Sequence, residues 1–250
     1  MSLDAAGTAH TLNIGSILQA GGTGVRPPPI AAPQLGRRLR LMLEIGLFFI
    51  AGPFMIRYAV YGLHLPLFVV LVPVFVALIL YLLWDDTFNV VREFSGGFAT
   101  AEAGSIVLVF VAVGAVVTAF VSQRFPDAFL ALPANNPRLW AKIMLLYPIF
   151  SVLAQELIYR SFFFHRYGPL FGRERWLIIL TNAAVFGLAH IIYGSIVSLV
   201  LTAIFGVLLA WRYERTRSYW AVWFEHTLYG LLVFTIGLGR YFFTGVANIG

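Results

Sequence analysis

Long apolar runs separated by short polar connections dominate the chain from residue 41 onward. A helix needs about 20 residues to cross the hydrocarbon core of a bilayer, which is roughly 30 Å thick. Seven runs have about this length, and they predict membrane-spanning helices at about 41–62, 65–84, 104–122, 139–164, 176–193, 195–212 and 219–238. The pattern therefore predicts an all-α fold, a polytopic transmembrane helical bundle with about seven spans.

The first 36 residues differ from the rest of the chain. They contain clustered glycine and proline and little periodic apolar content, which is typical of a flexible polar tail. Residues 37–250 are mostly spans with short loops, which leaves no room for a second folded domain. We therefore predict a tail over 1–36 and one transmembrane helical domain over 37–250.

Composition agrees with a membrane protein. Hydrophobic residues make up 60% of the chain and charged residues 11%, whereas soluble domains have about 25% charged residues. The chain has no cysteine, so disulfides and thiolate nucleophiles are excluded.

The net charge of +6 does not indicate nucleic acid, because the basic residues flank the apolar spans. More of them fall on the side of the N-terminus, which predicts that this side is cytoplasmic. We expect a multi-pass integral protein in contact with lipid, in the plasma (inner) membrane if the source is bacterial.

Several ionisable side chains lie inside the predicted spans. Glu156 and Arg160 fall in the fourth span, His190 in the fifth and His226 in the seventh. Buried charges in a membrane are costly and usually functional. Counting about 1.5 Å per helical residue puts Glu156, His190 and His226 in the middle part of the bilayer core, so three helices can bring them to one interior site.

Each of these residues also has a structural interpretation. Glu156 and Arg160 have the i, i+4 spacing of a helical ion pair, and an isolated histidine often packs against a backbone carbonyl. One glutamate and two histidines equal the ligand set of a catalytic zinc, although the chain lacks a His-Glu-x-x-His motif. A divalent metal held by Glu156, His190 and His226 is therefore an alternative to a site without a cofactor.

The order Gln155-Glu156-x-x-x-Arg160, Phe186-x-x-x-His190 and then an intramembrane His226 resembles the CAAX protease and bacteriocin-processing (Abi) family. The resemblance extends over about residues 139–245. The family motifs are Glu-Glu-x-x-x-Arg, Phe-x-x-x-His and His-x-x-x-Asn. Here they fall on 155–160, 186–190 and 226–230, with Gln155 in place of the first glutamate and Gly230 in place of the asparagine.

The resemblance implies a polytopic, glutamate-dependent membrane endopeptidase. The best understood member removes the last three residues of prenylated CAAX proteins. In the family mechanism the first glutamate and the second-motif histidine activate water, and the third-motif histidine and asparagine stabilise the oxyanion. We transfer these roles as a hypothesis in which Glu156 and His190 activate water and His226 contacts the oxyanion.

Two further residues complete the predicted site. Gln155 has no useful basicity and is expected to donate a hydrogen bond, while Arg160 is the expected partner of Glu156. Gly230 provides no oxyanion donor, so Tyr229 or a water molecule would have to replace the asparagine.

The sequence thus predicts an intramembrane endopeptidase of the CAAX-processing type. Its partner would be a protein or peptide substrate, lipidated substrates included, and not nucleic acid. The alternative is a non-catalytic membrane binding or immunity protein of the same fold, which the departures at Gln155 and Gly230 favour. A small transporter fits less well, because the chain has no inverted repeat.

Overall fold

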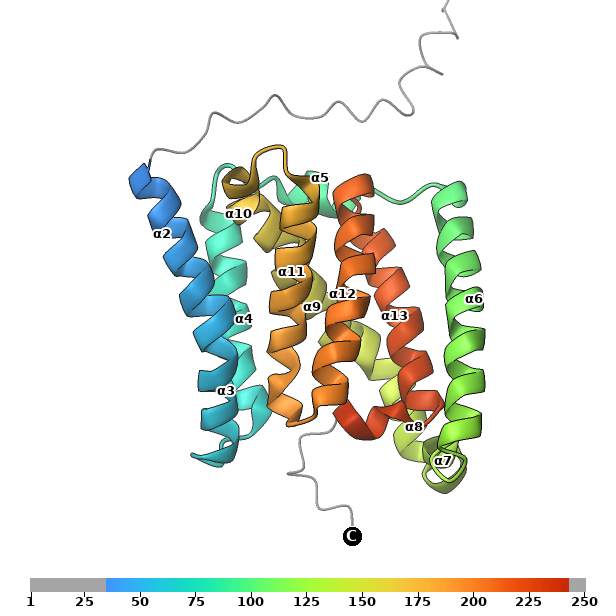
Figure 1. The fold of residues 1–250 in the computed structure, drawn as a ribbon. Helices are drawn as coiled ribbons and strands as arrows, with labels where there is room; N and C mark the ends of the chain where they lie inside the picture. The colour runs from blue at the N-terminus through green and yellow to red at the C-terminus, as the bar shows by residue number, and fades with distance from the viewer. Residues whose placement is uncertain (1–34, 243–250) are drawn as a thin grey trace, which may run out of the picture. The chain divides into compact units, whose positions relative to one another are not determined.

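The computed structural model describes residues 35–242, and every regular element in that part is a helix (Figure 1). The predicted all-α fold is confirmed. The tail predicted over 1–36 lies almost entirely outside the described residues.

Two long helices are composites in which α-helical segments alternate with π-helical turns. The first comprises α2 (Leu35–Ile45), η1 (Gly46–Ala51) and α3 (Gly52–Tyr61). The second comprises α8 (Pro137–Leu146), η2 (Tyr147–Val152), α9 (Leu153–Glu156), η3 (Leu157–Phe162) and α10 (Phe163–Phe171).

The other long helices are continuous. They are α4 (Leu67–Trp84), α6 (Thr100–Arg124), α11 (Arg175–Ala189), α12 (Ile196–Thr216) and α13 (Tyr219–Thr235). The short elements are α5 (Val90–Ser95), α7 (Ala131–Asn135) and the 3-10 turns η4 (His190–Tyr193) and η5 (Leu238–Phe242).

Six helices are long and apolar enough to cross a membrane, namely those over 35–61, 67–84, 100–124, 137–171, 175–193 and 196–216. They correspond to the first six predicted spans, with the observed ends several residues further out at 35, 171 and 216. The seventh predicted span corresponds to α13, which has 17 residues and is not among the six.

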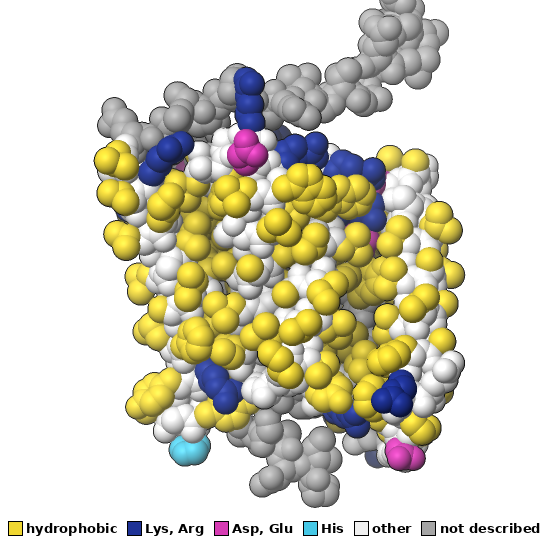
Figure 2. Space-filling model, in the orientation of Figure 1, with side chains coloured by type: hydrophobic (Ala, Val, Ile, Leu, Met, Phe, Trp, Pro, Cys, Tyr) yellow, Lys and Arg dark blue, Asp and Glu magenta, His cyan; other side chains and the backbone are white. Residues whose placement is uncertain are grey.

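The outer surface is strongly apolar. Hydrophobic side chains cover most of the face in Figure 2, and Lys and Arg gather near its upper and lower edges. On α4, for example, Phe68 and Leu80 are 69% and 61% exposed. Apolar surface of this extent is unfavourable in water and suits contact with lipid. The protein is an integral, multi-pass membrane protein.

Helix α13 occupies a central position among the helices that carry the motifs. It packs against α6, α12 and the composite helix over 137–171 (Figure 1). Helices α11 and α12 form a close antiparallel hairpin with a turn at Gly194, whose φ is +64°. A Cβ on Gly187 would lie 2.6 Å from Cβ of Ala203, so the hairpin requires glycine there.

Glu44 and Arg57, the two charged residues of the first predicted span over 41–62, both have partners. Arg166 of α10 donates two hydrogen bonds to Glu44, at 3.0 and 2.8 Å. Arg57 donates to the carbonyl oxygen of Ile191 in η4, at 3.1 Å. These contacts attach the first composite helix to α10 and to the end of α11, and they explain why an apolar span contains a carboxylate and a guanidinium.

Candidate active site

Glu156 lies between two π-helical turns, η2 and η3. Pro148, near the start of η2, has no N–H and cannot continue the α-helical hydrogen-bond pattern. Side chains of α13 bind carbonyl oxygens of this region, since Trp223 Nε1 donates to Pro148 and the Tyr219 hydroxyl donates to Leu153, both at 2.9 Å. These bonds hold α13 directly beside Glu156.

The central contact of the site joins Glu156 to His226. Oε1 of Glu156 lies 2.7 Å from Nδ1 of His226. Glu156 is 0% exposed and His226 is 4% exposed. As a carboxylate, Glu156 accepts the hydrogen of Nδ1, which leaves Nε2 as the reactive nitrogen of His226.

Arg160 lies on the other side of the carboxylate. Its Nε is 3.3 Å from Oε2 of Glu156, and its Nη1 donates to Oδ1 of Asn182 on α11 at 2.7 Å. Asn182 in turn donates to the carbonyl oxygen of Tyr159, at 2.5 Å. Sequence reasoning missed Asn182, although an amide inside an apolar span is a signal of the same kind as Glu156.

His190 is brought near the pair but forms no hydrogen bond with Glu156 among the described residues. Its Nδ1 lies 2.8 Å from the carbonyl oxygen of Phe186. A carbonyl only accepts, so Nδ1 carries the hydrogen and Nε2 of the neutral ring is an acceptor. The ring of Phe186 contacts both imidazoles, with centroid distances of 5.0 Å to His190 and 5.7 Å to His226.

Tyr147 is a second residue that sequence reasoning missed. Its hydroxyl lies 3.2 Å from Nε2 of His226. The Tyr147 ring fills the space next to Gly230, where an added Cβ would overlap the ring. The glycine at the last position of the third motif therefore makes room for a tyrosine from a different helix.

The two residues proposed from sequence as additional donors have other surroundings. Gln155 donates through Nε2 to Oγ of Ser151 at 2.7 Å, and its buried Oε1 has no hydrogen-bond partner within residues 35–242. The Tyr229 ring packs against Phe110 and Phe205, and its buried hydroxyl has no hydrogen-bond partner there either. Neither side chain hydrogen bonds to Glu156 or His226 among the described residues.

The alternative metal set is not assembled in this arrangement. Within residues 35–242, no three His, Asp or Glu side chains are grouped closely enough to hold a metal ion. Glu156 and His226 form a hydrogen bond, whereas His190 forms one with the carbonyl oxygen of Phe186. The donor set does not fit a three-ligand zinc site, and we derive no step through a metal.

Glu225, next to His226 in the chain, belongs to a separate ion-pair network. Arg212 donates to both of its carboxylate oxygens, at 2.7 and 2.9 Å, and also to Glu102 at 2.5 Å. Glu102 receives a further bond from Arg215 at 2.7 Å. This network joins α6, α12 and α13, so its role is structural.

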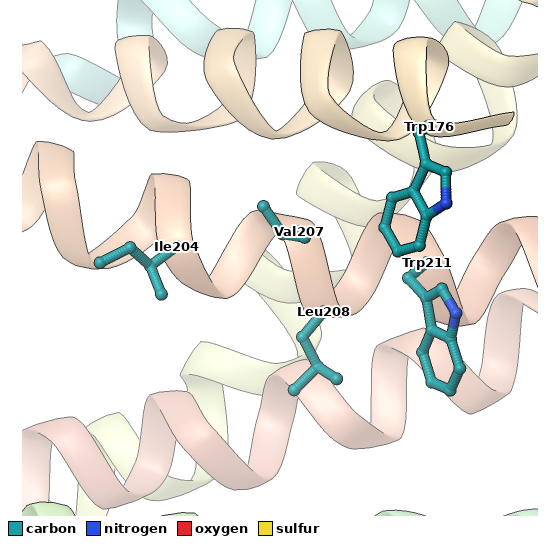
Figure 3. Close-up of a pocket in the computed structure, with 5 residues that line it drawn as sticks. All are labelled: Trp176, Ile204, Val207, Leu208 and Trp211. Atoms are coloured by element: carbon teal, nitrogen blue, oxygen red, sulfur yellow. The ribbon is translucent and has the colours of Figure 1, made fainter. Parts of the chain in front are cut away.

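A groove of about 310 Å³ lies on the outer side of α11 and α12 (Figure 3). It is lined by Trp176, Ile204, Val207, Leu208 and Trp211. The lining is apolar and contains none of the motif residues. The groove is therefore not the candidate active site.

The fold and the site together define a polytopic helical membrane protein with a buried carboxylate–imidazole pair. Residues 137–232 match the model of a family described as Rce1-like, type II CAAX prenyl endopeptidase. The match confirms the resemblance predicted from the motifs. It begins at the first residue of α8 and ends within α13, so it contains all three motifs. No curated protein and no solved structure matches the chain.

Proposed function

We propose that the protein is an intramembrane endopeptidase of the CAAX-processing type that cleaves a protein or peptide at the membrane. The observation that carries the proposal is the 2.7 Å contact between Glu156 and His226 in a buried site. The Rce1-like family match over 137–232 supports the same class of reaction.

In the proposed reaction, a water molecule attacks the carbonyl carbon of the scissile peptide bond. Oε1 of Glu156 is occupied by His226. Oε2 forms no hydrogen bond within the described residues, although Nε of Arg160 lies 3.3 Å away, and it is the oxygen that accepts a proton from water in this scheme. Nε2 of His190 is the second acceptor available for that proton. The proton then moves to the amide nitrogen as the C–N bond breaks.

His226 has the complementary task in this scheme. A protonated imidazole carries a hydrogen on Nε2 and can donate it to the oxyanion of the tetrahedral intermediate. The carboxylate of Glu156 beside Nδ1 stabilises that positive charge. Arg160 and Asn182 hold the carboxylate in place, and Gln155, through Ser151, supports the same turn of the helix.

The proposal also covers location and partners. The apolar surface favours an integral membrane location, which would be the plasma (inner) membrane in a bacterium, and the arginine distribution favours an N-terminus in the cytoplasm. We propose that the side chains alone activate water, without a cofactor, and that the substrate reaches the site from within or beside the bilayer. Prenylated and other lipidated proteins are candidate substrates on this basis.

Quantitative proteomics of protein termini tests the proposal without a guess about the substrate. Membranes that contain the wild-type chain are compared with membranes that contain equal amounts of folded Glu156→Gln and His190→Ala variants. Glu214→Gln is the matched control, because Glu214 pairs with Arg175 and Arg217 outside the site. We expect new termini with wild type and Glu214→Gln but not with the other two variants.

The second candidate is a non-catalytic binding or immunity protein of the same fold. Its support is that two family motif positions carry Gln155 and Gly230, and that the site side chains are at most 8% exposed for Glu156, His190 and His226. This candidate predicts the same termini in all four membrane samples at matched expression. That result would reject the peptidase.

A further inference from the structure

We propose that the hydroxyl of Tyr147 is a second hydrogen-bond donor to the oxyanion, acting together with Nε2 of His226. This inference rests on the proposed peptidase function. It assigns a catalytic role to a residue outside the three motifs, on a different helix from His226.

The first support is position. Tyr147 begins η2, and its hydroxyl lies 3.2 Å from Nε2 of His226. Its ring is held edge-on by Phe234, with ring centroids 5.3 Å apart. The hydroxyl and Nε2 therefore lie side by side and can reach one oxygen atom.

The second support is the glycine opposite. Gly230 follows His226 by four residues on α13, which is one helical turn along the same face. Any side chain there would overlap the Tyr147 ring. The space that a residue at position 230 would fill beside His226 is thus taken by a hydroxyl from η2.

The third support is the hydrogen-bond pattern of His226. Its Nδ1 is occupied by Glu156, so only Nε2 can gain a proton or change its hydrogen-bond partner during the reaction. When the ring is neutral, Nε2 accepts the hydrogen of the Tyr147 hydroxyl. When the ring is protonated, Nε2 carries a hydrogen of its own and can no longer accept, so the hydroxyl turns to another acceptor.

When the ring of His226 is protonated before the attack, an oxyanion formed at this point receives two donors, the Nε2–H of His226 and the O–H of Tyr147. The step balances without a change at Tyr147. Water oxygen bonds to the carbonyl carbon, the carbonyl electron pair moves to its oxygen, and the base takes the proton of the water. The tyrosine keeps its hydrogen throughout.

The test compares Tyr147→Phe with Tyr167→Phe by the rate at which the wild-type-specific termini accumulate in membranes. Both substitutions remove one buried hydroxyl and keep the ring, but Tyr167 lies on α10, and its hydroxyl has no hydrogen-bond partner among the described residues. We expect Tyr147→Phe to slow cleavage by about 100-fold to 1,000-fold, the usual effect of losing one oxyanion donor. Tyr167→Phe should cleave at the wild-type rate.

A pair of substitutions tests whether Tyr147 and a side chain at position 230 would occupy the same space beside His226. Gly230→Asn alone should unfold at a lower temperature in detergent, because the added side chain overlaps the Tyr147 ring. Tyr147→Ala with Gly230→Asn should fold and recover part of the cleavage lost in Tyr147→Ala, because an amide donor then occupies the same space. No recovery in a folded double variant would contradict the proposed donor role.

The outcomes separate the two proposals. Cleavage that is lost in Glu156→Gln but equal in Tyr147→Phe and Tyr167→Phe would overturn the role of Tyr147 and leave the peptidase intact. New termini that are the same with wild type and Glu156→Gln would overturn both.

Discussion

Nδ1 of His226 lies 2.7 Å from Oε1 of Glu156, and this contact joins two residues that are 70 positions apart in the chain. In the proposed mechanism, the carboxylate stabilises the protonated imidazole, so neither residue acts alone. Groups that act as a unit give strongly non-additive losses when both are removed.

We therefore expect Glu156→Ala and His226→Ala each to lower the rate of peptide cleavage by at least about 100-fold, the lower end of general acid–base effects. The double variant should be little worse than either single variant. The rate of formation of new termini in membranes measures all three. Losses that simply multiply would show that the two residues act independently.

Asn182 should control the position of Arg160. In Asn182→Leu, the buried guanidinium loses the acceptor at 2.7 Å, and the Tyr159 carbonyl loses its donor at 2.5 Å. We expect a loss of about 1–3 kcal/mol in the free energy of unfolding, as for other buried polar groups left without a partner. Reversible unfolding in mixed detergent micelles measures it.

Asn182→Asp is the matched control, because it keeps an acceptor for Arg160, removes the donor to Tyr159 and adds a carboxylate with which Arg160 can pair. It should unfold with a smaller loss of free energy than Asn182→Leu. Equal stability of Asn182→Leu and wild type would contradict the structural role.

Breaking the Arg212–Glu225 pair should lower the free energy of unfolding strongly, whereas replacing both residues should lower it much less. Glu225→Leu leaves Arg212, which is 1% exposed, without its bidentate partner, and we expect a loss of about 3–5 kcal/mol in unfolding free energy. Arg212→Met with Glu225→Leu should recover most of that loss, because Glu102 keeps Arg215 as a partner. A double variant as unstable as Glu225→Leu would argue against this account.

Gly187 should be essential for the α11–α12 hairpin. In Gly187→Ala, the new methyl group would lie 2.6 Å from Cβ of Ala203, so the helices must move apart. We expect a loss of about 1–3 kcal/mol, the usual cost of overpacking. Thermal unfolding in detergent measures it, and Gly187→Ala with Ala203→Gly should restore much of the stability. Without this recovery, the close contact with Ala203 would not be the cause.

Much of the fold and part of the site could be predicted from the sequence. Apolar runs located the helices, and the spacing of Glu156 and Arg160 placed both on one helical face. A depth calculation placed His226 near Glu156, and the two do meet. These properties depend on residues close together in the chain, or on length alone.

The features that could not be predicted from the sequence depend on contacts between distant segments of the chain. The π-helical turns beside Glu156 are accompanied by bonds from Trp223 and Tyr219, about 70 residues later. The contact of Tyr147 with His226 depends on how those turns rotate the helix, and no local pattern marks it. Counting residues along straight helices gives depth but not direction, so the hydrogen bond from His190 to the carbonyl oxygen of Phe186 could not be predicted.

A π-helical turn precedes Glu156, so the direction of the Glu156 side chain depends on how many residues precede it in the helix as well as on which residues they are. A turn of this kind holds one more residue than an α-helical turn. Each residue of an α-helix rotates the next side chain by about 100°, since 3.6 residues complete a turn. Deleting one residue from the α-helical part next to this turn would leave hydropathy and length almost unchanged, yet it would rotate Glu156 by about 100° relative to the residues before the deletion. In this helix, insertions and deletions are therefore a more direct route to losing or redirecting the site than most substitutions.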